Sequence, residues 1–256
     1  MKGYGAQQVR DAEAPHLAAG EPLMARAAAA LARVCEELLT DGGLALAHAR
    51  VVMIIGGGNN GGDALYAAAH LATARVTVEL VRTSSRVHEE GLTAALAAGA
   101  TELTGPPAKL AARAKSADLI VDGILGTGTS ANPRLRGAAR DLVAALAPMV
   151  ESRRSRDSKP GSPQDRFETT PAAPPQRPGW PKVVAVDIPS GIHPDTGEVP
   201  DPEAVLTADV TVTFGGAKAG LLIEPGASFA GGIRLFEIGL AADLGKLTPL
   251  LDSPEG

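Results

Sequence analysis

The sequence predicts an α/β fold in which a mostly parallel sheet is covered by helices on both faces. Short runs of apolar, β-branched residues alternate along the chain with alanine-rich stretches of helical periodicity. These runs are apolar throughout, as expected of parallel strands that are buried on both sides. The two observations together favour a doubly wound sheet.

Taken in order, the chain begins with two predicted helices, and the second of them starts at a proline and ends before a pair of glycines. These helices span residues 7–19 and 22–39. Predicted strands follow at 51–55, 76–81, 119–121, 183–186, 210–214 and 233–238, with a weak strand near Glu102. Helical patterns at 63–72, 88–98 and 134–146 lie between them. If the strand order is 3-2-1-4-5, the first, fourth and fifth strands are neighbours.

One stretch, residues 151–181, interrupts this alternation. It is rich in proline, serine and charge and has almost no apolar content, so it cannot bury enough surface to offset its ordering entropy. Because the following strand continues the same sheet pattern, we interpret the stretch as a disordered insertion and not as a domain linker. The sequence thus predicts a single domain over residues 1–256.

Composition excludes several classes of protein. A net charge of −5 gives no electrostatic footprint for nucleic acid or an anionic membrane. The single Cys35 excludes an internal disulfide, and neither a signal peptide nor a long uncharged apolar run is evident. We therefore expect a soluble, cytoplasmic protein.

The segment GGGNNGGD, residues 56–63, directly follows the first predicted strand and precedes a helix. Its glycines satisfy the G-x-G-x-x-G spacing, which allows a tight turn and a close approach of the backbone to a ligand. The N-terminus of the following helix offers free N–H groups to a phosphate. The asparagine pair adds side chains suited to an amide-bearing ligand or an ion. We predict that this segment binds a nucleotide.

Three acidic residues stand at or just beyond the ends of the first, fourth and fifth strands: Asp63, Asp122 and Asp187. If the strands have the order 3-2-1-4-5, their carboxylates converge on the crevice at the carboxyl edge of the sheet. Asp118 and Asp209 precede their strands, so we interpret them as structural. The oxygen-rich set Asn60, Asp122 and Ser190 suggests a hard cation instead of zinc.

Two further loops reach the same edge. Residues 126–132 form a hydroxyl-rich loop after Asp122, and Lys218 follows the strand at 210–214. Lys218 is equally compatible with contact to a phosphate or carboxamide and with a solvated loop charge.

The combination of these motifs resembles the NAD(P)H-hydrate epimerases, the YjeF N-terminal domain family. The likeness covers nearly the whole chain apart from 151–181 and rests on an ordered set of segments: QQVR at 7–10, LMARA at 23–27, GGGNNGGD at 56–63, VDGILGTG at 121–128, DIPSG at 187–191, and TFG at 213–215 with Lys218. The chain departs from the usual pattern at Ala64 and at 123–125, without loss of a polar functional group.

The resemblance implies a Rossmann-like three-layer αβα sandwich, often dimeric, that interconverts the R and S forms of NADHX and NADPHX. Carried over by position, the residues expected to contact the substrate are Asn59, Asn60, Gly61, Gly62, Asp63, Gly126, Thr127, Gly128, Thr129, Ser130, Ala131, Asn132 and Asp187. The resemblance also implies one potassium ion (K+) per subunit, held by Asn60, Asp122 and Ser190.

We hypothesise from the chemistry that Asp122 acts as the acid/base, stabilising an iminium-like cation and moving a proton to and from the departing C6 oxygen. Two alternatives stay open. An NADP-linked oxidoreductase would use Arg82 and Arg86 near a 2′-phosphate, although no hydride-transfer partner is evident. The second alternative is a non-catalytic nucleotide-binding scaffold, in which the 151–181 segment would serve as the surface that contacts a partner.

Overall fold

The computed structural model describes residues 1–129, 132–157 and 181–252. Within these residues, seven strands form one sheet in the order β4-β3-β2-β5-β6-β7-β9, and every neighbouring pair is parallel. The strands are β2 (Arg50–Ile55), β3 (Thr77–Arg82), β4 (Thr101–Glu102), β5 (Leu119–Gly123), β6 (Lys182–Val186), β7 (Val210–Phe214) and β9 (Gly232–Phe236). The predicted α/β class is confirmed. The observed strand order contains the arrangement 3-2-1-4-5 that the sequence analysis considered, with β2 as the first strand and β4 as the weak third.

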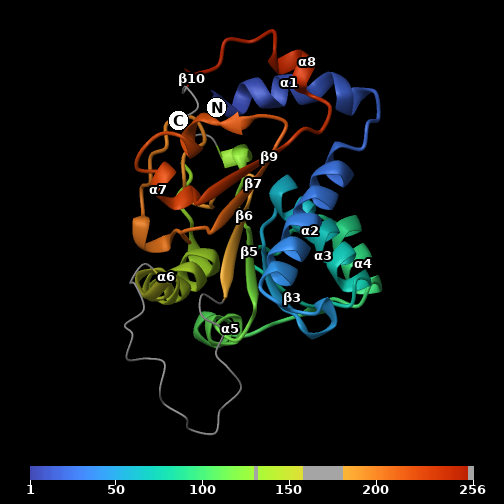
Figure 1. Ribbon diagram of the computed structural model, residues 1–256, viewed down its shortest axis with the longest axis vertical. Helices are drawn as coiled ribbons and strands as arrows, with labels where there is room; N and C mark the ends of the chain where they lie inside the picture. The colour runs from blue at the N-terminus through green and yellow to red at the C-terminus, as the bar shows by residue number, and fades with distance from the viewer. Residues whose placement is uncertain (130–131, 158–180, 253–256) are drawn as a thin grey trace, which may run out of the picture.

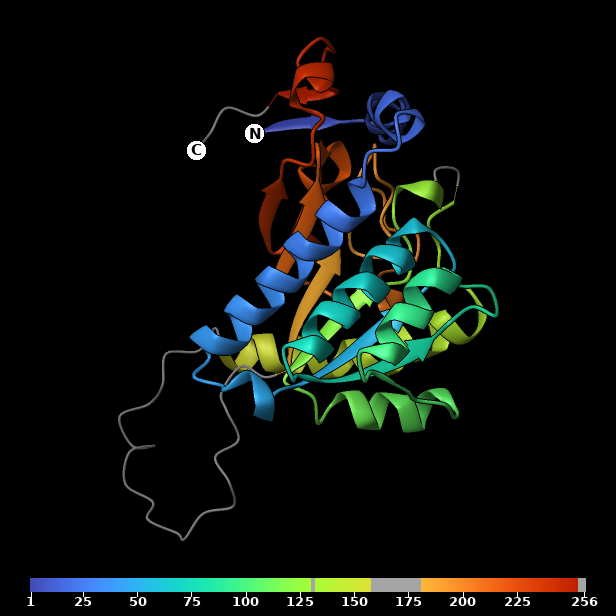
Figure 2. The same cartoon turned by 90° about the vertical axis from the view of Figure 1, so that its right-hand side faces the viewer.

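Helices cover both faces of the sheet (Figures 1 and 2). The helices are α1 (Ala6–Ala18), α2 (Leu23–Asp41), α3 (Asn59–Thr73), α4 (Glu89–Ala97), α5 (Pro107–Ala114), α6 (Gly137–Asp157), α7 (Ala227–Ala230) and α8 (Ala241–Leu244).

Strand β2 shows how the layers arise from the sequence. Val51, Met53 and Ile55 belong to the core shared with α2 and α3, whereas Val52 and Ile54 belong to the core beneath α5 and α6. Because successive side chains of a strand point to opposite faces, an unbroken apolar run supplies both cores. The predicted three-layer αβα sandwich is therefore observed.

A second, small sheet was not predicted. Strand β1 (Lys2–Tyr4) pairs in parallel with β8 (Ala217–Lys218) and antiparallel with β10 (Leu251–Asp252). This sheet brings the two ends of the chain together beyond the large sheet, beside α1 (Figure 1). It thereby places α1 over the edge where the strands of the large sheet end.

Helix α6 corrects the start of the predicted insertion. It runs to Asp157, so residues 151–157 are helical and not disordered. The reason is a buried arginine: Arg153 is 2% exposed, donates to both carboxylate oxygens of Asp209 at 2.8 and 2.7 Å, and donates to the Pro181 carbonyl at 2.8 Å. Residues 158–180 of the predicted insertion lie outside the described residues.

The two acidic residues that precede strands hold backbone groups. Asp118 accepts from the Arg50 N–H at 2.8 Å, and Asp209 accepts from the Val183 N–H at 2.7 Å. Both contacts agree with the structural role predicted for them. Across the described part of the chain, no helix combines the length and apolar character that crossing a membrane requires.

Candidate active site

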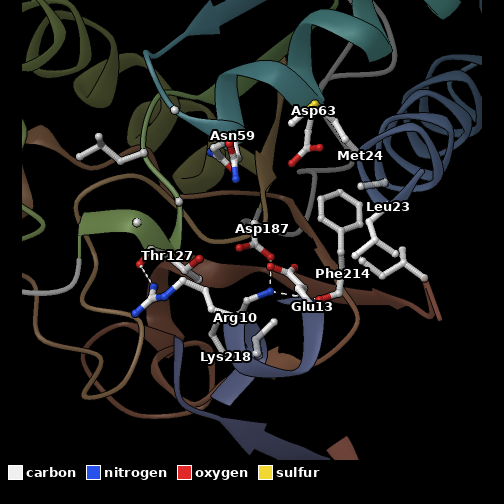
Figure 3. A pocket seen from close by; sticks show the side chains of 18 of the residues that line it. Arg10, Glu13, Leu23, Met24, Asn59, Asp63, Thr127, Asp187, Phe214 and Lys218 are labelled. Carbon is white, nitrogen blue, oxygen red and sulfur yellow. Dashed lines mark hydrogen bonds and ion pairs between the residues drawn. The ribbon is translucent and has the colours of Figure 1, made fainter. Parts of the chain in front are cut away.

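A cavity of about 570 Å³ lies at the carboxyl edge of the sheet, between α1, α2 and the start of α3 (Figure 3). Its polar lining comes from Arg10, Glu13, Asn59, Asn60, Asp63, Thr127, Asp187 and Lys218. Its apolar lining includes Leu17, Leu23, Met24, Ala27, Phe214 and Ile238. The cavity therefore has ionisable groups grouped against an apolar wall, as expected of a site for a small organic ligand.

The glycine-rich segment borders this cavity, but its glycines act mainly through close packing. Helix α3 already begins at Asn59, four residues before the predicted start, and none of the glycines from 56 to 62 has a positive φ. A Cβ on Gly56 would lie 1.8 Å from the Ile124 carbonyl oxygen, and one on Gly61 would lie 2.2 Å from the Gly56 carbonyl oxygen. At Gly58, by contrast, the space around a Cβ is open.

The N-terminus of α3 faces the cavity without a side-chain cap. Its N-cap is Gly58, which has no side chain to accept from the first-turn N–H groups. Gly58 and Asn59 line the cavity, so these donors and the positive end of the helix dipole are available to an anionic group of a ligand. The predicted contact residues 59–63 thus occupy the first turn of a helix.

Lys218 and Asp187 form a buried ion pair at the base of the cavity (Figure 3). The Lys218 side chain is 2% exposed; its ammonium contacts Asp187 Oδ1, the Phe214 carbonyl at 3.1 Å and Thr213 Oγ1 at 3.3 Å. Thr213 also donates to Asp187 Oδ1 at 3.1 Å. These contacts exclude the interpretation of Lys218 as a solvated loop charge.

Asp63 points into the same cavity from the first turn of α3. Burial raises the pKa of its carboxyl well above the ordinary range; the negative charges of Asp187 and Glu13 raise it further, and Lys218 opposes them. No described residue hydrogen-bonds to this carboxyl group. Asp63 is therefore a candidate to exchange a proton with a ligand in the cavity.

Helix α1 contributes two residues that the sequence interpretation did not assign to the site. Arg10 Nη1 donates to the Thr127 carbonyl at 2.8 Å, and Glu13 lies near the Asp187–Lys218 pair (Figure 3). Burial is the largest effect on Glu13 and raises the pKa of its carboxyl. The sequence signal for this helix was the 7–10 segment of the resemblance, which carried no assigned role.

Asp122 does not line the cavity. It is 1% exposed and accepts three hydrogen bonds: from Ser190 Oγ at 2.7 Å, from the Ser190 N–H at 2.9 Å and from the Ile124 N–H at 3.3 Å. Its position follows from strand alternation, because Asp122 shares the face of Ile120, which packs under α5 and α6. Of the three predicted acids, Asp63 and Asp187 meet at the cavity and Asp122 lies behind its wall.

Asn60, Asp122 and Ser190 lie along the backbone of residues 124–126. Ser190 Oγ is 2.9 Å from the Leu125 nitrogen and 3.2 Å from the Leu125 carbonyl oxygen. Asn60 is 6% exposed, and a Cβ on Gly126 would lie 3.0 Å from its Oδ1. Its Nδ2 is buried and has no hydrogen-bond partner among the described residues.

The predicted contact loop 126–132 divides between two cavities. Gly126, Thr127 and Gly128 line the first cavity, and Gly128 and Asn132 line a second cavity of about 570 Å³ on the other side of the glycine segment. Thr129 ends a short 3-10 helix, Thr127–Thr129, and Ser130 and Ala131 lie outside the described residues.

The oxidoreductase alternative finds little support here. Arg82 pairs with Glu102 at 2.6 Å, so it is not free for a 2′-phosphate. No histidine or tyrosine side chain is among the described residues that line the first cavity.

Comparison with known proteins places this arrangement in a family. Residues 20–220 match the model of the family described as YjeF-related protein N-terminus. The chain is 47% identical over 254 residues to NAD(P)H-hydrate epimerase of Clavibacter michiganensis subsp. michiganensis, covering 97% of this chain and 94% of the relative. A relative of the same name from Microbacterium testaceum is 40% identical over 250 residues, covering 97% and 83%. The crystal structure of yeast ynu0 shares the fold, with a TM-score of 0.65, 19% identity, and coverage of 93% and 88%. The chain therefore belongs to the YjeF-related N-terminal family, as the resemblance predicted.

Proposed function

We propose that this protein is an NAD(P)H-hydrate epimerase, an isomerase that interconverts the R and S forms of NADHX and NADPHX. Two relatives that the chain covers almost completely bear this name. The observation that carries the proposal is the grouping of Asp63 with the Asp187–Lys218 pair around one cavity. We also expect the reaction to take place in the cytoplasm, in a protein that forms homodimers.

The lining of the cavity suggests how the substrate is oriented. Uncapped N–H groups of α3, Arg10 and the Thr127 backbone lie at one end and suit the diphosphate. Leu23, Met24 and Phe214 lie at the other and suit the face of the reduced nicotinamide ring (Figure 3). This orientation places the hydrated ring carbon among Asp63, Asp187 and Lys218.

The reaction requires the C6–oxygen bond of the ring to break and form again. In our proposal Asp63, whose carboxyl pKa is raised by burial, gives its proton to the C6 hydroxyl, and water departs with the bonding electron pair. The lone pair of the ring nitrogen then forms the C=N bond of an iminium cation, which the Asp187 carboxylate stabilises. Addition of water to the opposite face gives the other epimer. Asp122, which the sequence suggested as acid/base, is too enclosed by Ser190 and Ile124 to serve here.

Asp122 fits the predicted potassium site better. Asn60, Asp122 and Ser190 supply amide, carboxylate and hydroxyl oxygens, the donors that suit a hard cation. The support for the ion is this oxygen chemistry, because the unpartnered Asn60 Nδ2 is a donor that calls for an acceptor and not for a cation. A bound potassium ion would supply positive charge and would hold the 124–126 backbone, and with it the cavity wall, in place.

The test is equilibration of purified R-NADHX and S-NADHX, separated by chromatography, with and without the protein. We expect catalysis in the wild type and a fall of about 10²-fold or more for Asp63→Asn, because the proton donor is lost. Asp141→Asn is the matched control, since Asp141 is exposed on α6 away from the cavity. An inactive wild type overturns the proposed function, and a fully active, folded Asp63→Asn variant overturns the role of Asp63.

A further inference from the structure

Helix α1 presents one continuous face to the cavity. Val9, Arg10, Glu13 and Leu17 all line it. These positions are spaced as i, i+1, i+4 and i+8, which places them on the same side of a helix. The helix thus forms one wall of the site, and along this wall follow the cation of Arg10, the carboxyl of Glu13 and the apolar side chain of Leu17.

This wall is fixed at three points. At its start the Ala6 N–H donates to Asp195 Oδ1 at 2.6 Å. In the middle Arg10 contacts the Thr127 carbonyl, and near the end His16 lies 2.7 Å from Glu21 and 2.9 Å from Asp243. Glu13 therefore has a defined position, and it extends from the wall opposite the one that bears Asp63 (Figure 3).

Glu13 has no hydrogen bond or ion pair with any described residue, although it lies near the Asp187–Lys218 pair. Burial is the largest effect and raises the pKa of this carboxyl; the charge of Lys218 opposes it, Asp187 raises the pKa to a smaller extent, and Arg10 lowers it least. A carboxyl without a structural partner in a cavity of this kind is available to a ligand.

Epimerisation at a planar cation imposes a requirement on the site. The hydroxyl departs from one face of the ring, and water must add to the other face. A single carboxyl on one wall can assist proton transfer on its own face, whereas the other face needs a second group within hydrogen-bond distance.

Resting on the function proposed above, we propose that Glu13 is a second catalytic acid/base, which serves the ring face opposite to Asp63. In one direction Asp63 gives a proton to the C6 hydroxyl, the C6–oxygen bond breaks, and water leaves. A second water then attacks C6 from the α1 side, its oxygen forms the new bond, and its proton passes to the Glu13 carboxylate. Asp63 ends ionised and Glu13 protonated, ready for the reverse reaction or for proton exchange with solvent.

Glu13→Gln tests this assignment when epimerisation and the uptake of oxygen from H₂¹⁸O at C6 are measured together. We expect epimerisation to fall by about 10²-fold or more. Exchange should continue for the one epimer whose hydroxyl faces Asp63, because departure and return on that face do not need Glu13. Asp63→Asn should show the converse, with exchange confined to the other epimer.

Asp11→Asn is the matched control: it lies on the same helix, is exposed, and undergoes the same change from carboxyl to amide. Thermal unfolding of Glu13→Gln shows whether the variant is folded. Glu13→Asp keeps a carboxyl at this position and should retain part of the epimerase activity. Wild-type epimerisation by a folded Glu13→Gln variant overturns the proposal, and so does a parallel loss of exchange for both epimers. An inactive wild type would overturn the proposed function instead, so the two failures are distinguishable.

Discussion

Replacing Lys218 with methionine removes the cation from a buried pair and leaves Asp187 without its ammonium partner. Lys218 is 2% exposed and the Asp187 side chain 12% exposed, so solvent replaces little of the lost interaction. Breaking a buried pair by removing one partner costs about 3–5 kcal/mol. Because Asp187 borders the cavity, where water reaches it, we expect a loss of about 3 kcal/mol in the free energy of unfolding.

A double-mutant cycle separates the pair from its surroundings. Asp187→Asn leaves the more deeply buried ammonium without a counter-charge, so we expect a cost of about 3–5 kcal/mol, reduced toward the lower end because the amide oxygen still accepts from Lys218. The double variant lacks both charges and should be more stable than the sum of the two losses predicts. Urea unfolding followed by far-ultraviolet circular dichroism measures all four proteins. Strictly additive effects, or a Lys218→Met variant within about 0.5 kcal/mol of the wild type, would refute the reasoning.

Two further predictions concern packing and pH. Gly56→Ala should lower the free energy of unfolding by about 1–3 kcal/mol, since its Cβ would meet the Ile124 carbonyl oxygen at 1.8 Å. Gly58→Ala places its Cβ in open space and should change the free energy of unfolding little. Equal urea midpoints for the two variants would contradict this prediction. Hydrogen bonds that the His16 ring donates to Asp243 and Glu21 raise the pKa of His16. Its stabilising contribution is therefore complete below the unfolded-state pKa of about 6.5 and is lost as pH rises through the folded-state value. The melting temperature of the wild type should therefore exceed that of His16→Gln more at pH 6 than at pH 9, and a pH-independent difference would exclude this linkage.

The strands and the edge at which the cavity lies could be predicted because they depend on local patterns. An unbroken apolar run such as VVMII at 51–55 indicates a strand that is buried on both faces, and the residues after such strands meet at one edge. Glu13 could not be found in this way. Its place in the cavity depends on Asp195, Thr127 and Asp243, which are far along the chain, and no periodicity reports such contacts.

Asp122 and Asp187 occupy similar positions at the ends of strands, but their carboxylates point to different places. A strand-end motif therefore does not determine whether its acidic side chain faces the cavity. Asp122 is the penultimate residue of β5, and Asp187 directly follows β6. By alternation both belong on the face toward α5 and α6, since Ile120 and Ala185 pack there. Asp122 obeys this rule and is buried behind the cavity wall. Asp187 does not, because its φ of 66° lies in the left-handed region, which aspartate tolerates better than most residues. This turn directs the carboxylate to Lys218 and the cavity. The same motif at two neighbouring strands thus gives one buried organising acid and one acid that faces the ligand, and a single backbone angle decides which.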